Sequence, residues 1–290
     1  MDDNTTFGQE DPTERGWKQR LGEDFLIRLG AGVVMGLVAL AFTLAGAMPF
    51  AVLVVLAAVV VSWEWGRMVH GSDANNVIAV LIITAALAGI LAATGLVGLG
   101  LLALPIGAIL ATLLSLGRNS VFSALGVFYA GIPAVSLIWL RSDPFYGLKA
   151  VIFLLLVVIA ADTGAFLAGR LIGGAKLWPS VSPKKTWSGL AGAIVAGAVV
   201  GALFWLAVPG GSAAWLAWMG ALLAAAAQAG DLAESALKRR FGVKDASGLI
   251  PGHGGVMDRV DGVIAAAVAV AVIAIAIDVY APARALLLGW

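Results

Sequence analysis

The chain lacks cysteine altogether and has little charge. With no cysteine among 290 residues, a disulfide framework, a thiolate metal site and a cysteine nucleophile are all excluded. Charged residues make up 12% of the sequence, whereas soluble globular domains carry roughly 25%. Histidine occurs only at His70 and His253, so a zinc site built from His and Cys is excluded as well. An ordinary soluble domain therefore does not fit this composition.

Long apolar runs are abundant instead. The chain is 61% hydrophobic with a mean hydropathy of +1.00, and its apolar runs are long enough to cross about 30 Å of hydrocarbon. We predict an all-α, polytopic integral membrane protein of about nine transmembrane helices. Residues 1–24 are predicted to be a cytoplasmic N-terminal tail, and residues 25–290 a single transmembrane domain. The predicted spans are Phe25–Ala47, Pro49–Trp65, Val77–Leu96, Val97–Leu116, Val121–Leu140, Leu148–Leu171, Gly189–Val208, Ala213–Gly230 and Val263–Tyr280.

The positions of lysine and arginine predict the orientation, because cytoplasmic loops are enriched in both residues. With the N-terminus in the cytoplasm, fourteen basic residues fall in inside segments and three in outside segments, Arg28 being left out. The two polar regions, about 170–188 and about 231–262, then lie on the cytoplasmic side.

Acidic residues lie at several of the predicted helix ends. Asp162 lies within the sixth predicted span, Asp231 closes the eighth, and Asp258 and Asp261 precede the ninth. Singly, each has an ordinary explanation: a hydrogen bond to a neighbouring span, an interfacial acid, or a contact with a helix N-terminus. Together they suggest convergence on a hard cation, and carboxylate oxygens suit Mg²⁺.

Two loops are candidates for binding phosphate. Lys184 and Lys185 lie in the segment Ser182-Pro-Lys-Lys-Thr186, and His253, Gly254 and Gly255 lie in a glycine-rich segment. The lysines would also suit simple cytoplasmic anchors, and the glycines a flexible connector. Lysines, glycine backbone donors and a cation are the groups that commonly hold polyphosphate. Neither a Walker A loop nor a dinucleotide-binding glycine motif is present.

These residues resemble the phosphatidate cytidylyltransferases, also called CDP-diacylglycerol synthases. That family has the pattern Ser-x-hydrophobic-Lys-Arg, then Lys-Asp, then His-Gly-Gly-hydrophobic-x-Asp-Arg-hydrophobic-Asp. It is matched by Ser235, Leu237, Lys238, Arg239, Lys244, Asp245, Ser247, His253, Gly254, Gly255, Val256, Asp258, Arg259, Val260 and Asp261. A second family-like element runs from Asp162 through Arg170 to Trp187, although Ser188 stands where many relatives have glutamate.

The resemblance implies a transfer of CMP from CTP to phosphatidic acid, giving CDP-diacylglycerol and pyrophosphate. It also implies Mg²⁺ as cofactor, with a second cation left open, a homodimer, and no nucleic acid partner. The implied location is the bacterial cytoplasmic (inner) membrane, with the active site facing the cytoplasm. The predicted metal ligands are Asp231, Asp258 and Asp261, with Asp162 a weaker candidate. The predicted catalytic residues are Lys238, Arg239, His253 and Arg259, and the predicted substrate-binding residues are Ser182, Lys184, Lys185, Thr186, Lys244, Gly254 and Gly255. His253 is expected either to donate to the leaving pyrophosphate or to hold the glycine loop.

Two other functions are each compatible with part of this sequence. A CDP-alcohol phosphotransferase has a motif that begins Asp-Gly-x-x-Ala-Arg, and Asp261-Gly262 begins in the same way, but the arginine and the later aspartates of that motif are missing. A secondary transporter or channel would use an acid within the membrane, such as Asp162, for ion coupling. Most of the ionisable residues, however, lie in the predicted cytoplasmic segments.

Overall fold

The computed structural model describes residues 34, 36–71, 74–250 and 254–290. Within these residues, eight helices are long and apolar enough to cross a membrane, and the shorter apolar helix Gly36–Ala45 precedes them. The predicted class, a polytopic all-α membrane protein, is confirmed. The elements are α2 (Ala47–His70), α3 (Asn75–Ala93), α4 (Val97–Leu114), α5 (Ser120–Arg141), α6 (Gly147–Leu171), β1 (Lys176–Trp178), β2 (Ser182–Thr186), α7 (Trp187–Phe204), the 3₁₀ turn Trp205–Ala207, α8 (Ala213–Arg240), α9 (Met257–Ile277) and α10 (Pro282–Leu288).

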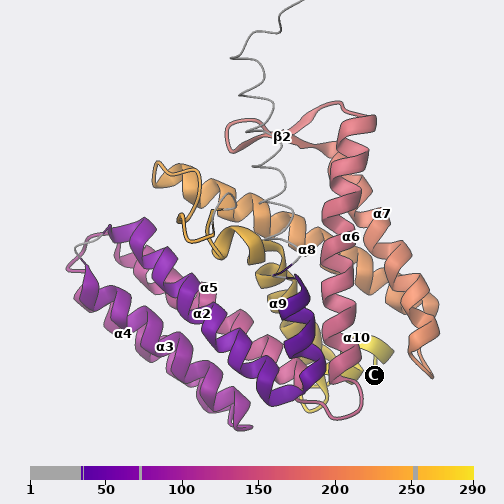
Figure 1. Cartoon of the computed structure of the whole chain (residues 1–290), viewed down its shortest axis with the longest axis horizontal. Coiled ribbons are helices and arrows are strands. Elements are labelled where there is room, and N and C mark those ends of the chain that lie inside the picture. The colour runs from indigo at the N-terminus through magenta and orange to yellow at the C-terminus, as the bar shows by residue number, and fades with distance from the viewer. Residues whose placement is uncertain (1–33, 35, 72–73, 251–253) are drawn as a thin grey trace, which may run out of the picture.

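The helices form two groups with α9 between them (Figure 1). One group consists of α2 to α5, packed against one another, and the other of α6, α7 and α8. Helix α9 contacts members of both groups, namely α2, α5, α6 and α8. The N-terminal end of α9 is therefore a place where side chains from distant parts of the sequence meet.

Small residues allow the second group to pack closely. A Cβ atom on Gly164 would lie 2.6 Å from the Gly192 carbonyl oxygen, and one on Gly197 would lie 2.5 Å from the Gly220 carbonyl oxygen. At these positions the backbone of α6 lies against that of α7, and the backbone of α7 lies against that of α8. Helix pairs in lipid gain stability from close packing of this kind rather than from a hydrophobic driving force.

The helix boundaries differ from the predicted spans at both ends of the signature region. Helix α8 continues past Gly230 to Arg240, and α9 begins at Met257 rather than Val263. Hydropathy alone ends a span where charge begins, whereas a helix can continue into the polar interface if its side chains find partners. Asp231, Asp258 and Asp261 are consequently all helical.

The predicted first span and tail can be compared with the structure only in part. Residues 1–24 lie outside the described residues, as do residues 25–33 and residue 35. Helix Gly36–Ala45 coincides with the second half of the first predicted span, and Gly46 separates it from α2. The count of nine spans and the cytoplasmic N-terminus stay predictions.

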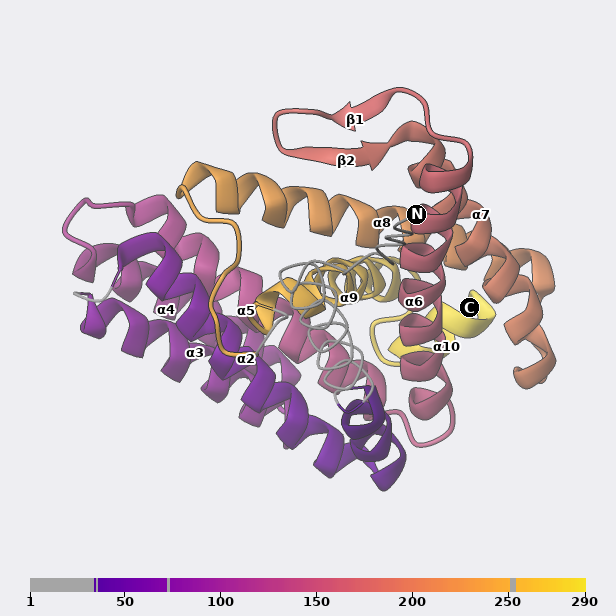
Figure 2. The same cartoon turned by 45° about the horizontal axis from the view of Figure 1, so that its top comes forward.

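The second polar loop, 170–188, folds into a short antiparallel hairpin of β1 and β2. The hairpin joins α6 to α7 and extends beside α8 (Figure 2). Lys176 pairs with Thr186 and Trp178 with Ser182. The hairpin gives Lys184 and Lys185 a defined backbone, so they are not part of an irregular connector.

Candidate active site

Helices α8 and α9 cross where the predicted metal ligands lie. A Cβ atom on Gly230 would collide with the Ala265 side chain and would lie 2.8 Å from the Asp261 carbonyl oxygen. Because only a hydrogen fits there, the two backbones touch, and Asp231 comes within electrostatic range of Asp261. Glu234, one turn further along α8, is buried and contacts both Asp261 and Lys238. The structure therefore brings together acids from two helices.

The hairpin supplies a cation to this group of acids. The Lys185 ammonium lies 2.5 Å from Asp231 Oδ2, so the second polar loop and the end of the eighth span meet as one site. Thr186 caps α7, since its hydroxyl accepts a hydrogen bond from the Gly189 amide at 3.1 Å. Ser188 hydrogen-bonds with Thr186 and donates to the Gly173 carbonyl. Serine at position 188 thus ties the two ends of the loop together.

A polar cavity of about 430 Å³ opens between α6, α7, α8 and the hairpin. Lys184, Lys185, Thr186 and Asp231 line it, together with Asp162. Gln228 on α8 donates to Asp162 Oδ1 at 3.0 Å and so fixes this carboxylate from a neighbouring helix. Ser182, the other predicted substrate contact of the hairpin, is half-buried in β2, where it pairs with Trp178.

Asp258, in the first turn of α9, contacts three donors. Its Oδ1 lies 2.7 Å from the Lys238 ammonium, and its Oδ2 accepts from the amides of Ala246 at 2.9 Å and Gly255 at 2.7 Å. A carboxylate offers about four lone pairs, so most of this acid's capacity holds the preceding loop and Lys238. Gly254, at φ +84°, makes the turn that directs the Gly255 amide toward Asp258.

The remaining predicted residues are more dispersed. Arg239 is exposed and donates to the Val243 carbonyl at 3.2 Å, and Lys244 is exposed in the turn after α8. Neither residue lines the polar cavity. Arg259 is exposed at the start of α9, and His253 lies outside the described residues.

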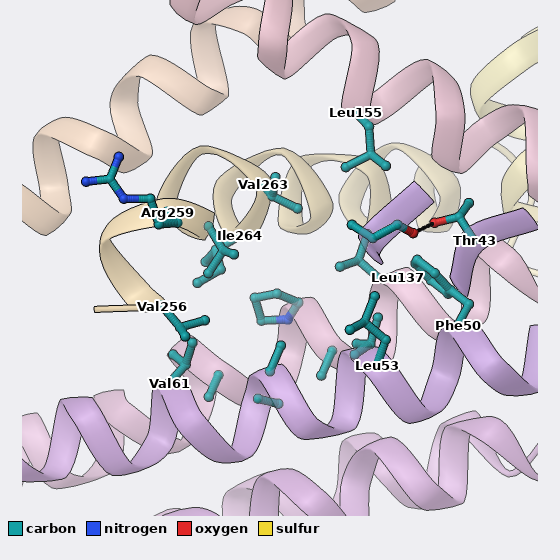
Figure 3. Close-up of a pocket in the computed structure, with 18 of the residues that line it drawn as sticks. Thr43, Phe50, Leu53, Val61, Leu137, Leu155, Val256, Arg259, Val263 and Ile264 are labelled. Atoms are coloured by element: carbon teal, nitrogen blue, oxygen red, sulfur yellow. Dashed lines mark hydrogen bonds between the residues drawn. The ribbon is translucent and has the colours of Figure 1, made fainter. Parts of the chain in front are cut away.

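A second cavity, of about 460 Å³, is almost entirely apolar. It is bounded by helix Gly36–Ala45 and by α2, α5, α6 and α9. Arg259 lies at one end, and Phe50 and Thr43 lie at the other (Figure 3). Arg259 and Val260 belong to this wall, while the next residue, Asp261, lies within electrostatic range of Asp231, which lines the polar cavity. The first turns of α9 therefore line the apolar cavity and lie near an acid of the polar cavity, although neither Asp258 nor Asp261 is among the residues that line the polar cavity.

Glu64 was missed by the sequence analysis. It is fully buried on α2 and accepts hydrogen bonds from the Ser247 hydroxyl at 2.6 Å and from the amides of Val256 at 2.9 Å and Met257 at 2.6 Å. The sequence did hold a signal, because Glu64 is the single charged residue in the predicted span Pro49–Trp65. An acid in an apolar span needs donors from elsewhere in the fold.

Glycine at position 255 is explained by the same carboxylate, because a Cβ atom there would collide with Glu64. Gly255→Ala is expected to lower the free energy of unfolding by about 1–3 kcal/mol, the usual cost of overpacking a filled site. Gly248→Ala in the same loop, where a Cβ would meet open space, is the matched control. Thermal unfolding in detergent should separate the two variants; equal melting temperatures would contradict the contact.

Comparison with known proteins identifies the family. The model of the cytidylyltransferase family matches residues 26–277. The chain belongs to this family. The family predicted from the signature residues is therefore confirmed, and with it an integral membrane enzyme of the nucleotidyltransferase class.

Individual relatives match different shares of the chain. The phosphatidate cytidylyltransferases of Brucella suis and Brucella abortus are each 39% identical to it over 249 residues, covering 83% of this chain and 89% of the relative. That of Staphylococcus saprophyticus is 40% identical over 144 residues, covering 49% of this chain and 54% of the relative.

Proposed function

We propose that this protein transfers CMP from CTP to phosphatidic acid, giving CDP-diacylglycerol and pyrophosphate. The observation that carries the proposal is the presence of two cavities near the start of α9. One cavity has lysines and carboxylates suited to a nucleoside triphosphate, and the other is apolar and suited to an acyl chain. The names of the relatives point to the same two substrates.

The residues present fit Mg²⁺. Within the part of the chain that the structure describes, no group of three or more His, Asp or Glu side chains is placed to hold a metal ion. Three protein ligands are not needed, because Mg²⁺ at phosphate sites is usually held by one or two carboxylates, with substrate phosphates and water completing the coordination. We propose Asp231 and Asp261 as the principal ligands. Asp258, whose oxygens already bind Lys238 and the loop amides, and Asp162 are the further candidates.

The proposed reaction needs little acid–base chemistry, because the lipid phosphate is already an anionic nucleophile at neutral pH. One of its oxygens attacks the α-phosphorus of CTP, and the bond from that phosphorus to the bridging oxygen breaks as pyrophosphate leaves. Bound Mg²⁺ would supply charge neutralisation to the phosphates. Lys184 and Lys185 bind the triphosphate, and Arg259, at the end of the apolar cavity, binds the lipid phosphate. Catalysis rests mainly on positioning and electrostatic stabilisation.

The membrane arrangement follows from the substrates. CTP is a soluble polyanion and phosphatidic acid lies in the bilayer, so the site belongs at the interface between the two. We propose that it faces the cytoplasm across the bacterial inner membrane, in keeping with the bias of lysine and arginine. The homodimer likewise stays a prediction.

The test is an incubation of the purified protein with radiolabelled CTP and phosphatidic acid in detergent, with Mg²⁺ or with EDTA. The expected result is a lipid-extractable labelled nucleotide and an equal amount of pyrophosphate, formed only with Mg²⁺ and only with both substrates. Absence of a lipid-soluble nucleotide from folded protein would reject the proposed function.

A further inference from the structure

We infer that Glu64 is a positioning residue. It holds the N-terminus of α9 in place, and in this way it also positions the groups that act on the two phosphates. The inference rests on the proposed function, since it concerns the efficiency of the same transfer. Glu64 is not among the residues that line either cavity, so its effect on substrates is indirect.

The contacts of Glu64 join three separate parts of the chain. From α2, its Oε1 binds the Ser247 hydroxyl of the α8–α9 connection and the Val256 amide, and its Oε2 binds the Met257 amide. Val256 and Met257 are the cap and first residue of α9. Their amides are donors without a partner inside the helix, and a negative charge beside them also suits the helix dipole. Glu64 therefore caps α9 from another helix.

The position of α9 matters because its first turns carry the proposed chemistry. Asp258 and Arg259 follow Met257 directly, and Asp261 lies one turn beyond. Asp258, which is part of α9, binds the same α8–α9 connection by accepting hydrogen bonds from the amides of Ala246 and Gly255. Two carboxylates thus fix one loop, and Glu64 is the one that fastens it to the α2–α5 group. A displacement of about 1 Å in reacting groups can cost about 100-fold in rate.

The site requires a carboxylate rather than merely a polar side chain. Glutamine would occupy the same volume but would replace one acceptor oxygen with an NH₂ donor. Since Oε1 and Oε2 each accept from a backbone amide, either orientation of that side chain would set the NH₂ group against an N–H. The Ser247 hydroxyl can turn to accept a hydrogen bond, whereas the amides of Val256 and Met257 cannot.

Glu64→Gln is therefore the decisive variant, with Val69→Ala as the matched control for loss of stability. Val69 is buried in the core of the same helix and lines neither cavity. Glu64→Gln is expected to lower kcat by about 10- to 100-fold while the KM for CTP changes little. This is the pattern expected when a substitution weakens stabilisation of the transition state rather than binding of the substrate. Val69→Ala should keep the wild-type kcat despite a lower melting temperature. Ser247→Ala, which removes one donor and keeps both amide contacts, should lose far less activity than Glu64→Gln.

Hydrogen exchange supplies a readout that does not depend on the reaction. In Glu64→Gln, amide exchange should speed up in peptides that cover residues 254–260 and stay unchanged in α3 and α4. Equal kcat in Glu64→Gln and wild type, or an activity loss that only follows the fraction of unfolded protein, would overturn the positioning role. Unchanged exchange at the α9 start would overturn it as well. If wild type itself makes no lipid nucleotide, the proposed function fails, and the exchange experiment still decides whether Glu64 holds α9.

Discussion

Asp261→Asn should lower kcat/KM for the transfer by about a thousandfold or more, since a metal ion supplies several kcal/mol of charge stabilisation and about 4 kcal/mol is a factor of a thousand. The Asp261 side chain lies where α8 and α9 touch, within electrostatic range of Asp231 and beside Glu234. Asparagine keeps the size of the side chain but removes the charge that a cation needs. The measurement is the initial rate at CTP and phosphatidic acid concentrations well below their KM values, repeated over a range of Mg²⁺ concentrations.

Asp278→Asn is the matched control for this variant. Asp278 directly follows the other end of α9, where it pairs with Arg284 at 2.6 Å, so the same substitution is made at the same helix but far along it from the site. It should leave the rate close to that of wild type. An Asp261→Asn enzyme that is folded and retains even a tenth of wild-type activity would exclude this residue as a principal ligand.

Filling the apolar cavity should impair use of the lipid while sparing the nucleotide. Ala57 lines this cavity from α2 and is half-buried, so a phenylalanine there would occupy space assigned to an acyl chain. Ala57→Phe is expected to lower kcat/KM for phosphatidic acid with long chains by about 100-fold, or about 2.7 kcal/mol. The KM for CTP should change little, because the lysines and acids of the polar cavity are untouched.

Val52→Phe controls for the added aromatic ring, since Val52 lies on the same helix with its side chain 52% exposed on the outer face. The rate of Ala57→Phe should recover with phosphatidic acid that carries short chains. Equal losses for long and short chains, or equal losses in the two variants, would show that this cavity does not hold the lipid.

The local arrangement of part of the candidate site could be predicted from the sequence, because several signature residues are close together in the chain. The spacing of Asp258 and Asp261 places both acids in the first turns of one helix, and the structure confirms this placement. The proximity of Lys185 to Asp231 was harder to predict, because it depends on the hairpin that places the second polar loop beside α8 (Figure 2). The roles assigned to these residues stay predictions.

Glu64 and the apolar cavity show what the sequence pattern could not supply. The donors of Glu64 lie 183 or more positions away in the chain, so no local pattern connects them. The cavity wall combines four of the spans with the helix Gly36–Ala45, and each contributes ordinary apolar side chains. Only the packing of α9 between the two helix groups brings these parts together. The ends of α8 and α9 were misplaced for a related reason, because their polar turns are stabilised by partners such as Lys185 and Glu64.

Binding of Mn²⁺, a paramagnetic substitute for Mg²⁺, tests most directly whether acids of α8 and α9 jointly hold a cation with the nucleotide. Electron paramagnetic resonance would be recorded for protein with Mn²⁺ and CTP in the absence of lipid, so that no turnover occurs. Wild type and Asp278→Asn should show a protein-bound Mn²⁺ signal that both Asp231→Asn and Asp261→Asn have lost. Bound Mn²⁺ at wild-type level in these two variants would contradict a cation site shared between the helices.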